Sequence, residues 1–97
     1  MAVFTERRLR AISRKLVQLR GELALTDEQL HHFADIADDS RIRALVSETP
    51  LADADHREAE RTSAAFARHR TEIVERIARL EAEQDDLLDQ LLARRSR

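Results

Sequence analysis

Cysteine, tryptophan and tyrosine are absent from this 97-residue chain, and glycine and proline occur once each. Without cysteine there is neither a disulfide framework nor a thiolate metal site, and nothing points to an oxidising compartment. Loop-forming residues are too few for a loop-rich fold, and aromatic and β-branched residues are too few for a sheet. No stretch approaches the roughly 20 apolar residues that span a bilayer. We therefore expect an all-α protein that is cytoplasmic and makes no contact with a membrane.

Two heptad stripes of mainly apolar side chains occupy the two halves of the chain. Their members are spaced by alternating steps of three and four, which places each stripe on one face of an α-helix. The first stripe comprises Leu9, Ile12, Leu16, Leu19, Leu23, Thr26, Leu30, Phe33, Ala37, Ser40 and Ala44. The second comprises His56, Ala59, Ser63, Phe66, Arg70, Ile73, Ile77, Leu80, Gln84, Leu87 and Leu91.

The two stripes mirror each other about Pro50. Leu9 falls opposite Leu91 and Phe33 opposite Phe66, with position numbers that add to 99 or 100. Layers of an antiparallel coiled coil must meet at matching heights in this way. The sequence therefore predicts an all-α fold, an antiparallel two-helix coiled-coil hairpin.

A strong helix break lies at Ser47 to Pro50. The residue before a proline is disfavoured in the helical region, while proline suits the first turn of a helix. Thr49 is the expected N-cap of the second helix, and Val46 and Leu51 are expected to pack against each other across the turn. The sequence thus predicts one hairpin over residues 1–97, with arms at about 4–46 and 50–93 and a turn at 47–50.

A weaker break lies between Gly21 and Thr26. Thr26 begins a segment with the form of a capping box, and a glycine costs about 1 kcal/mol inside a helix. A three-helix fold is therefore the alternative. The heptad stripe runs in phase from Leu23 to Leu30, which favours a continuous helix.

Core layers change character along the predicted seam. Leu30 faces Arg70, a polar layer of the kind that fixes register at some cost in stability. Beyond Phe33 the layers shrink to pairs such as Ser40 with Ala59, which bury less apolar area. We expect the turn end to be the less stable end of the hairpin.

One seam is a small core for a chain of this size. Ile36, Val74 and Leu88 fall on positions that flank the seam. We expect them to form a self-association flank, so that hairpins pair into a homo-oligomer such as a four-helix assembly.

Charge is uneven along the chain. Residues 1–20 carry six basic side chains and one acidic one, whereas residues 21–60 carry eleven acidic side chains and three arginines. Pairs with acidic residues of the second arm are expected to neutralise much of the basic charge. An acidic turn end remains, and its predicted partner-binding residues are Asp38, Asp39, Glu48, Asp53, Asp55 and Glu58.

Other chemistries find little support in the sequence. The N-terminal basic residues have no interleaved aromatics and the net charge is −2, so nucleic-acid binding is not expected. His31, His32, His69 and Asp35 fall at similar heights but lack a metal-binding motif, so we expect no metal and no cofactor. A two-helix hairpin offers no enclosed pocket for catalysis, and we expect no enzymatic activity.

Two resemblances bear on function. The segment Ala37–Ala52, followed by an acidic, alanine-rich arm, resembles uncharacterised small coiled-coil proteins of actinobacterial type, and this resemblance implies the fold but no activity. The hairpin with carboxylates at its turn is also similar to the coiled-coil arm of Gre-type transcript-cleavage factors, which reach into RNA polymerase. Their acidic loop motif is not reproduced at Glu48 to Asp55, and their second domain has no counterpart here.

The sequence favours a non-enzymatic helical-hairpin protein-protein interaction or adaptor protein. A transcription regulator that inserts its acidic coiled-coil tip into RNA polymerase is one alternative. A purely structural coiled-coil subunit is the other.

Overall fold

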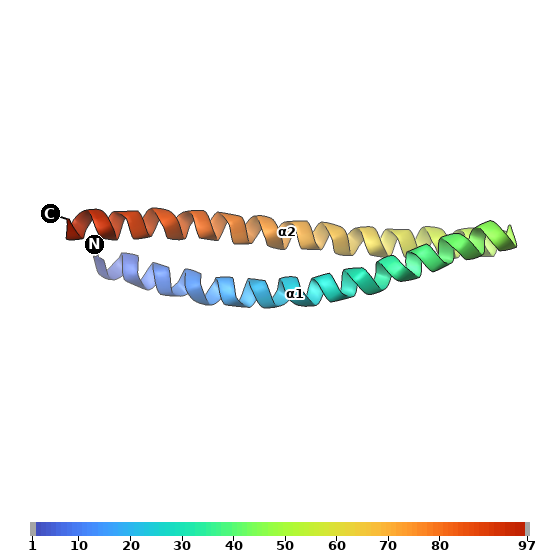
Figure 1. Ribbon diagram of the computed structural model, residues 1–97, viewed down its shortest axis with the longest axis horizontal. Helices are drawn as coiled ribbons and strands as arrows, with labels where there is room; N and C mark the ends of the chain where they lie inside the picture. The colour runs from blue at the N-terminus through green and yellow to red at the C-terminus, as the bar shows by residue number, and fades with distance from the viewer. Residues whose placement is uncertain (1, 97) are drawn as a thin grey trace. The chain divides into compact units, whose positions relative to one another are not determined.

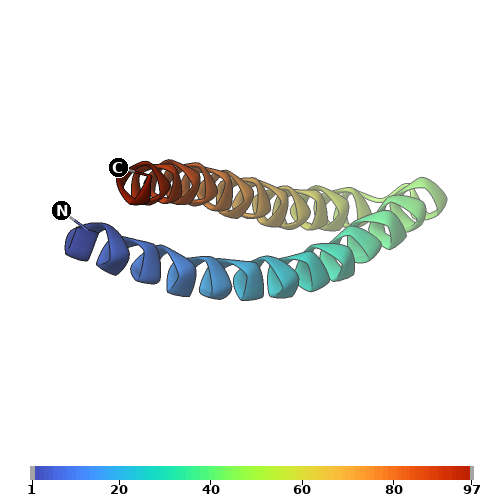
Figure 2. The same ribbon diagram turned by 60° about the vertical axis from the view of Figure 1, so that its left-hand side comes forward.

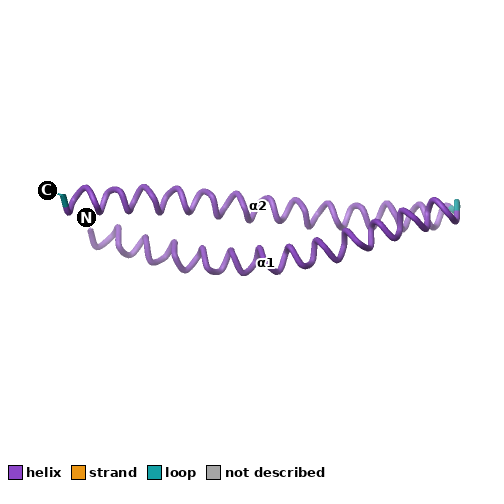
Figure 3. Tube along the Cα trace, viewed as in Figure 1, coloured by secondary structure: helices purple, strands orange, loops and turns teal. Residues whose placement is uncertain are grey.

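The computed structural model describes residues 2–96 and contains two α-helices, α1 (Ala2–Ser47) and α2 (Pro50–Arg95). They form a hairpin in which only Glu48 and Thr49 lie between the helices (Figures 1 and 3). Alanine, leucine and arginine, all strong helix formers, are among the commonest residues of both helices. No strand occurs within residues 2–96. The predicted antiparallel helical hairpin is confirmed.

The two predicted stripes form the seam between the helices. Every member of both stripes is buried or half-buried, whereas most residues between them are exposed. The seam continues one step beyond each stripe, to the buried Thr5 on α1 and the half-buried Ala52 on α2. The heptad pattern therefore determines which face of each helix is covered.

Helix α1 runs without interruption through Gly21 and Thr26. Thr26 is only 3% exposed and lies in the seam, so it does not act as an N-cap. The three-helix alternative is therefore wrong. Burial of the in-phase stripe outweighs the low helix propensity of Gly21 and the local capping pattern.

The turn combines a helix C-terminus with an N-cap. Glu48 has a positive φ of 50° and donates its backbone N–H to the carbonyl of Ala44 at 3.1 Å, which ends α1 in a left-handed residue. Thr49 Oγ1 accepts the backbone N–H of Ala52 at 3.2 Å. Thr49 is thus the N-cap of α2, as predicted, and Pro50 occupies the first helical position.

Contacts divide the chain into two units, which are described separately. The terminal unit comprises residues 1–23 and 73–97, of which 2–23 and 73–96 are described. Its core is a cluster of five buried aliphatic side chains, Ile12, Leu16, Leu19, Ile73 and Ile77, with Leu23, Leu80 and Leu87 packed against it. In this unit the start of α1 and the end of α2 lie at the same end (Figures 1 and 2).

The turn unit comprises residues 24–72. Phe33 and Phe66 stack with ring centroids 4.7 Å apart and planes inclined by 15°, which confirms the predicted pairing of these positions. Its fully buried residues are small or polar, namely Thr26, Ala37 and Ser40. The turn unit therefore has no buried cluster of large aliphatic side chains, in contrast to the terminal unit.

Candidate interaction surfaces

The six predicted acidic tip residues all lie in the turn unit, and all are exposed. Asp55 and Glu58 line one groove and Asp38 lines another. Asp53 lies in the first turn of α2, where a carboxylate interacts favourably with the helix dipole. Charge at the turn therefore serves helix stability as well as any contact with a partner.

Four large apolar side chains close to the turn in sequence are more than half exposed, which was not predicted from the sequence. The prediction that Val46 and Leu51 pack against each other is wrong, because these side chains are 79% and 73% exposed. Ile42 and Leu45, on the last turns of α1, are 53% and 67% exposed. We call these four residues the apolar turn patch. Their positions outside the heptad stripe are the signal that could have revealed it.

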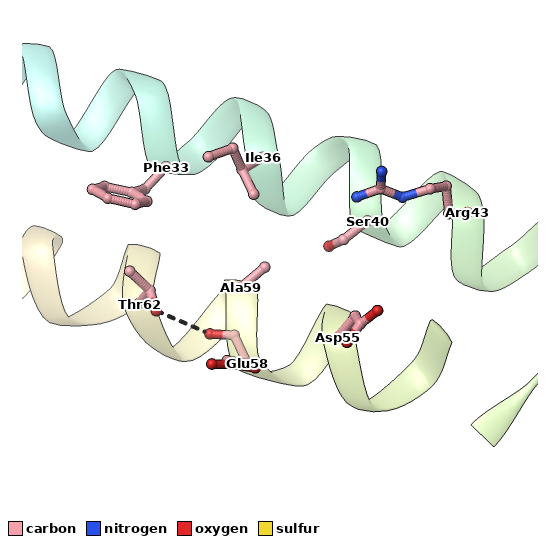
Figure 4. A pocket seen from close by; sticks show the side chains of 8 residues that line it. All are labelled: Phe33, Ile36, Ser40, Arg43, Asp55, Glu58, Ala59 and Thr62. Carbon is pink, nitrogen blue, oxygen red and sulfur yellow. Dashed lines mark hydrogen bonds between the residues drawn. The ribbon is translucent and has the colours of Figure 1, made fainter. Parts of the chain in front are cut away.

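A shallow groove of about 290 Å³ opens between α1 and α2 in the turn unit (Figure 4). The lining residues, which define the turn groove, are Phe33, Ile36, Ser40, Arg43, Asp55, Glu58, Ala59 and Thr62. Its α2 side carries two carboxylates, Asp55 and Glu58, and its α1 side carries the guanidinium of Arg43 (Figure 4). Phe33, Ile36 and Ala59 supply apolar surface between them.

Ser40, His56 and Glu60 form a short polar chain in the turn unit. Ser40 Oγ donates its only hydrogen to the carbonyl of Ala37 at 2.7 Å. It therefore accepts a hydrogen bond from His56 Nδ1, which lies 3.1 Å away. His56 Nε2 lies 3.6 Å from Glu60 Oε1. The order serine, histidine, carboxylate resembles a hydrolytic triad, but the hydroxyl hydrogen points to a carbonyl and Ser40 is only 3% exposed. In this geometry the polar interactions of Ser40 and His56 link the two helices where the core side chains are smallest.

A second groove, of about 570 Å³, lies in the terminal unit. Its lining residues, which define the basic groove, are Arg8, Lys15, Arg76, Arg79, Leu80 and Glu83. Arg8 donates two hydrogen bonds to Glu83, from Nε to Oε2 at 2.6 Å and from Nη2 to Oε1 at 2.7 Å. These bonds lower the pKa of Glu83 and raise that of Arg8.

Three cations of the basic groove have no anionic partner among the residues that the structure describes: Lys15, Arg76 and Arg79. The predicted pairing of the basic N-terminal arm with the second helix occurs at Arg8 and at Arg20, which lies 3.3 Å from Glu81. It does not extend to Lys15. The groove therefore keeps positive charge that the hairpin itself does not neutralise.

The three predicted flank residues lie in different units. Ile36 is in the turn unit and lines the turn groove, whereas Val74 and Leu88 are in the terminal unit. Their exposed fractions of 37%, 39% and 43% are lower than those of the apolar turn patch.

The histidines of the predicted mid-hairpin group interact within their own helices. His31 lies 3.5 Å from Asp35, and His69 lies 4.0 Å from Glu72. Across residues 2–96, no three side chains of metal-ligating type come together. Neither described helix is long and apolar enough to cross a membrane.

Comparison with known proteins finds no relative of this chain. No protein-family model, curated protein or solved structure matches this chain. The surfaces are therefore interpreted from their own chemistry.

Proposed function

We propose that this protein is a non-enzymatic helical-hairpin interaction or adaptor protein whose apolar turn patch binds an apolar site on a protein partner. The observation that carries the proposal is the exposure of Ile42, Leu45, Val46 and Leu51, each more than half exposed at the same turn. Exposed apolar side chains are unremarkable when scattered, but grouped ones are typical of interaction sites.

The chemistry around the patch supports a specific contact. Glu48 and Asp53 are close in sequence to these apolar residues and are exposed, so they can orient a partner that carries basic groups around its apolar site. Glu48 also occupies a left-handed backbone conformation that favours glycine or asparagine. Backbone strain of this kind is concentrated at functional sites.

The two alternatives differ from this proposal in what meets the turn. We place the interaction in the cytoplasm. A transcription regulator would insert the same turn into RNA polymerase, and a structural subunit would have no partner at the turn beyond its own assembly. Identification of the protein that binds the turn separates these functions.

Affinity capture from an extract of the source cells tests the proposal with matched variants. The test variant L45S/V46S/L51S removes most of the apolar turn patch. The control V17S/L25S/L92S replaces three apolar side chains that are also more than half exposed but lie elsewhere, at 69%, 56% and 60% exposure. Circular dichroism checks that both variants keep the helix content of the wild type.

The wild type and the control are expected to capture the same protein in stoichiometric amount, and the test variant is expected to lose it. A further variant, E48Q/D53N, should weaken capture if the carboxylates orient the partner. Capture that is equal for all variants, or absent for the wild type, contradicts the proposal. Capture of an RNA polymerase subunit by the turn would favour the transcription-regulator alternative.

A further inference from the structure

The two units of the chain carry opposite net charges. The terminal unit, residues 1–23 and 73–97, has eleven basic and eight acidic side chains, a net charge of +3. The turn unit, residues 24–72, has six basic and eleven acidic side chains, a net charge of −5. A second copy of the chain therefore offers each unit a surface of opposite charge.

The excess positive charge of the terminal unit is concentrated at the basic groove. Arg8 is already neutralised by Glu83, but Lys15, Arg76 and Arg79 line the same groove and form no ion pair within residues 2–96. Leu80 adds apolar surface between these cations. Such a groove fits an anionic segment that also presents an apolar side chain.

An acidic protein surface fits this groove better than a nucleic acid does. Nucleic-acid binding needs a positive track along the phosphate backbone, usually with aromatic side chains for base stacking. The basic groove is lined by no aromatic residue and includes the carboxylate of Glu83. Glu81, exposed and paired with Arg20, adds negative charge in the same unit.

The α2 side of the turn groove has the complementary features, whereas its α1 side carries the cation Arg43. Asp55 and Glu58 form its α2 side, and neither forms an ion pair within the described chain. The half-buried Phe33 and the exposed Ile36 add apolar surface to the same groove (Figure 4). The two unpaired carboxylates and apolar side chains of the turn groove are therefore complementary to the unpaired cations and Leu80 of the basic groove.

We infer that the basic groove of one copy binds the acidic side of the turn groove of a second copy, with Arg76 and Arg79 facing Asp55 and Glu58. Exposed ion pairs contribute little energy individually, so their main effect is to select which surfaces meet. The apolar turn patch takes no part in this contact. The inference therefore does not depend on the proposed function.

Charge reversal with a mixing step tests the inference. R76E/R79E makes the basic groove acidic, and D55K/E58K makes the acidic side of the turn groove basic. Controls with the same change in net charge are R10E/R14E and E28K/E72K, at exposed positions outside both grooves. Sedimentation at micromolar concentration measures self-association, and circular dichroism verifies helix content.

The wild type is expected to self-associate, and high salt should weaken the association by screening its charges. Each groove variant alone should associate about tenfold more weakly or worse, because like charges then face each other. An equimolar mixture of the two variants should recover the association, since the reversed surfaces again carry opposite charges. The two controls should behave like the wild type.

Four results overturn the inference. A wild type that stays monomeric at every concentration excludes a second copy as the occupant. Association that survives both reversals places the contact on an uncharged surface such as Val74 and Leu88. A mixture that fails to recover the association shows that the two grooves do not meet. Binding of a fluorescent DNA by the wild type that R76E/R79E abolishes, without any change in self-association, would assign the basic groove to nucleic acid instead.

Discussion

Arg70 reaches from α2 to α1 and donates its Nε–H to the Oδ1 carboxylate oxygen of Asp27. The Arg70 and Asp27 side chains remain 43% and 47% exposed, so the guanidinium lies at the edge of the seam. Arg70 was expected to be a polar core residue opposite Leu30. The long arginine side chain instead contributes its stem to the seam and carries its charge to the surface.

Replacement of Arg70 by leucine is expected to raise the free energy of unfolding by up to about 1 kcal/mol. The lost ion pair is exposed and worth less than about 1 kcal/mol, while leucine adds apolar contact with Leu30. Denaturant unfolding of R70L measures the net effect of losing the ion pair and gaining apolar contact, and the control D27A measures the loss of the ion pair alone. A marked destabilisation in R70L, together with a similar loss in D27A, would show that the ion pair contributes more than exposed pairs normally do.

The Gly21→Ala variant is expected to be more stable than the wild type by about 1 kcal/mol. Gly21 lies inside α1 without a positive φ, and a methyl group added there meets no atom within 4 Å. The variant therefore removes the conformational cost of glycine without a steric conflict. Thermal unfolding measures the difference, and no gain in stability would mean that α1 needs local flexibility at this position.

Asparagine at position 48 is expected to raise stability by about 0.5 to 1 kcal/mol, because asparagine tolerates the left-handed conformation better than glutamate. E48Q removes the charge but keeps the backbone strain, and it should therefore stay close to the wild type. E48V should be destabilised, since a β-branched residue is strongly disfavoured at a φ of 50°. An equal effect of E48N and E48Q would attribute the change to charge instead of conformation.

Stability should fall in acid partly through Glu83. The hydrogen bonds from Arg8 lower the pKa of Glu83 in the folded protein. A lowered folded-state pKa adds stability above the unfolded-state pKa, and this addition is lost as the pH falls through the folded-state value. E83Q should therefore be less stable than the wild type at neutral pH, with a difference that vanishes in strong acid. D89N removes an exposed carboxylate outside the groove and is the control for the loss of one negative charge at neutral pH.

The heptad spacing was sufficient to predict the fold. Apolar residues at alternating steps of three and four predicted the buried face of each helix. Because each helix has a single apolar face, the two faces pack against each other, and the mirrored spacing predicted the antiparallel pairing and the stacking of Phe33 on Phe66. The Thr49 N-cap was also predictable, since capping depends on neighbouring residues only.

Surface features were predicted less well. Val46 and Leu51 lie outside the heptad stripes, which indicates exposure, but turn geometry decides whether side chains that flank a turn also pack against each other. The charge left at Arg76 and Arg79 depends on which long side chains reach each other across the seam. Sequence shows that opposite charges are near, but side-chain geometry decides which of them pair.

The turn unit also bears on how the chain folds, because contacts near the turn join residues that are close in sequence. Contacts across the hairpin join residues that are 16 positions apart at Ser40 and His56, 43 apart at Asp27 and Arg70, and 75 apart at Arg8 and Glu83. The entropy cost of closing a loop rises with its length, by about 0.6 kcal/mol for each doubling. Contacts near the turn are therefore the first that the unfolded chain can form at low entropic cost, and each one shortens the loop that the next must close. We expect folding to start in the unit with the least buried aliphatic surface and to be completed by the aliphatic cluster of the terminal unit.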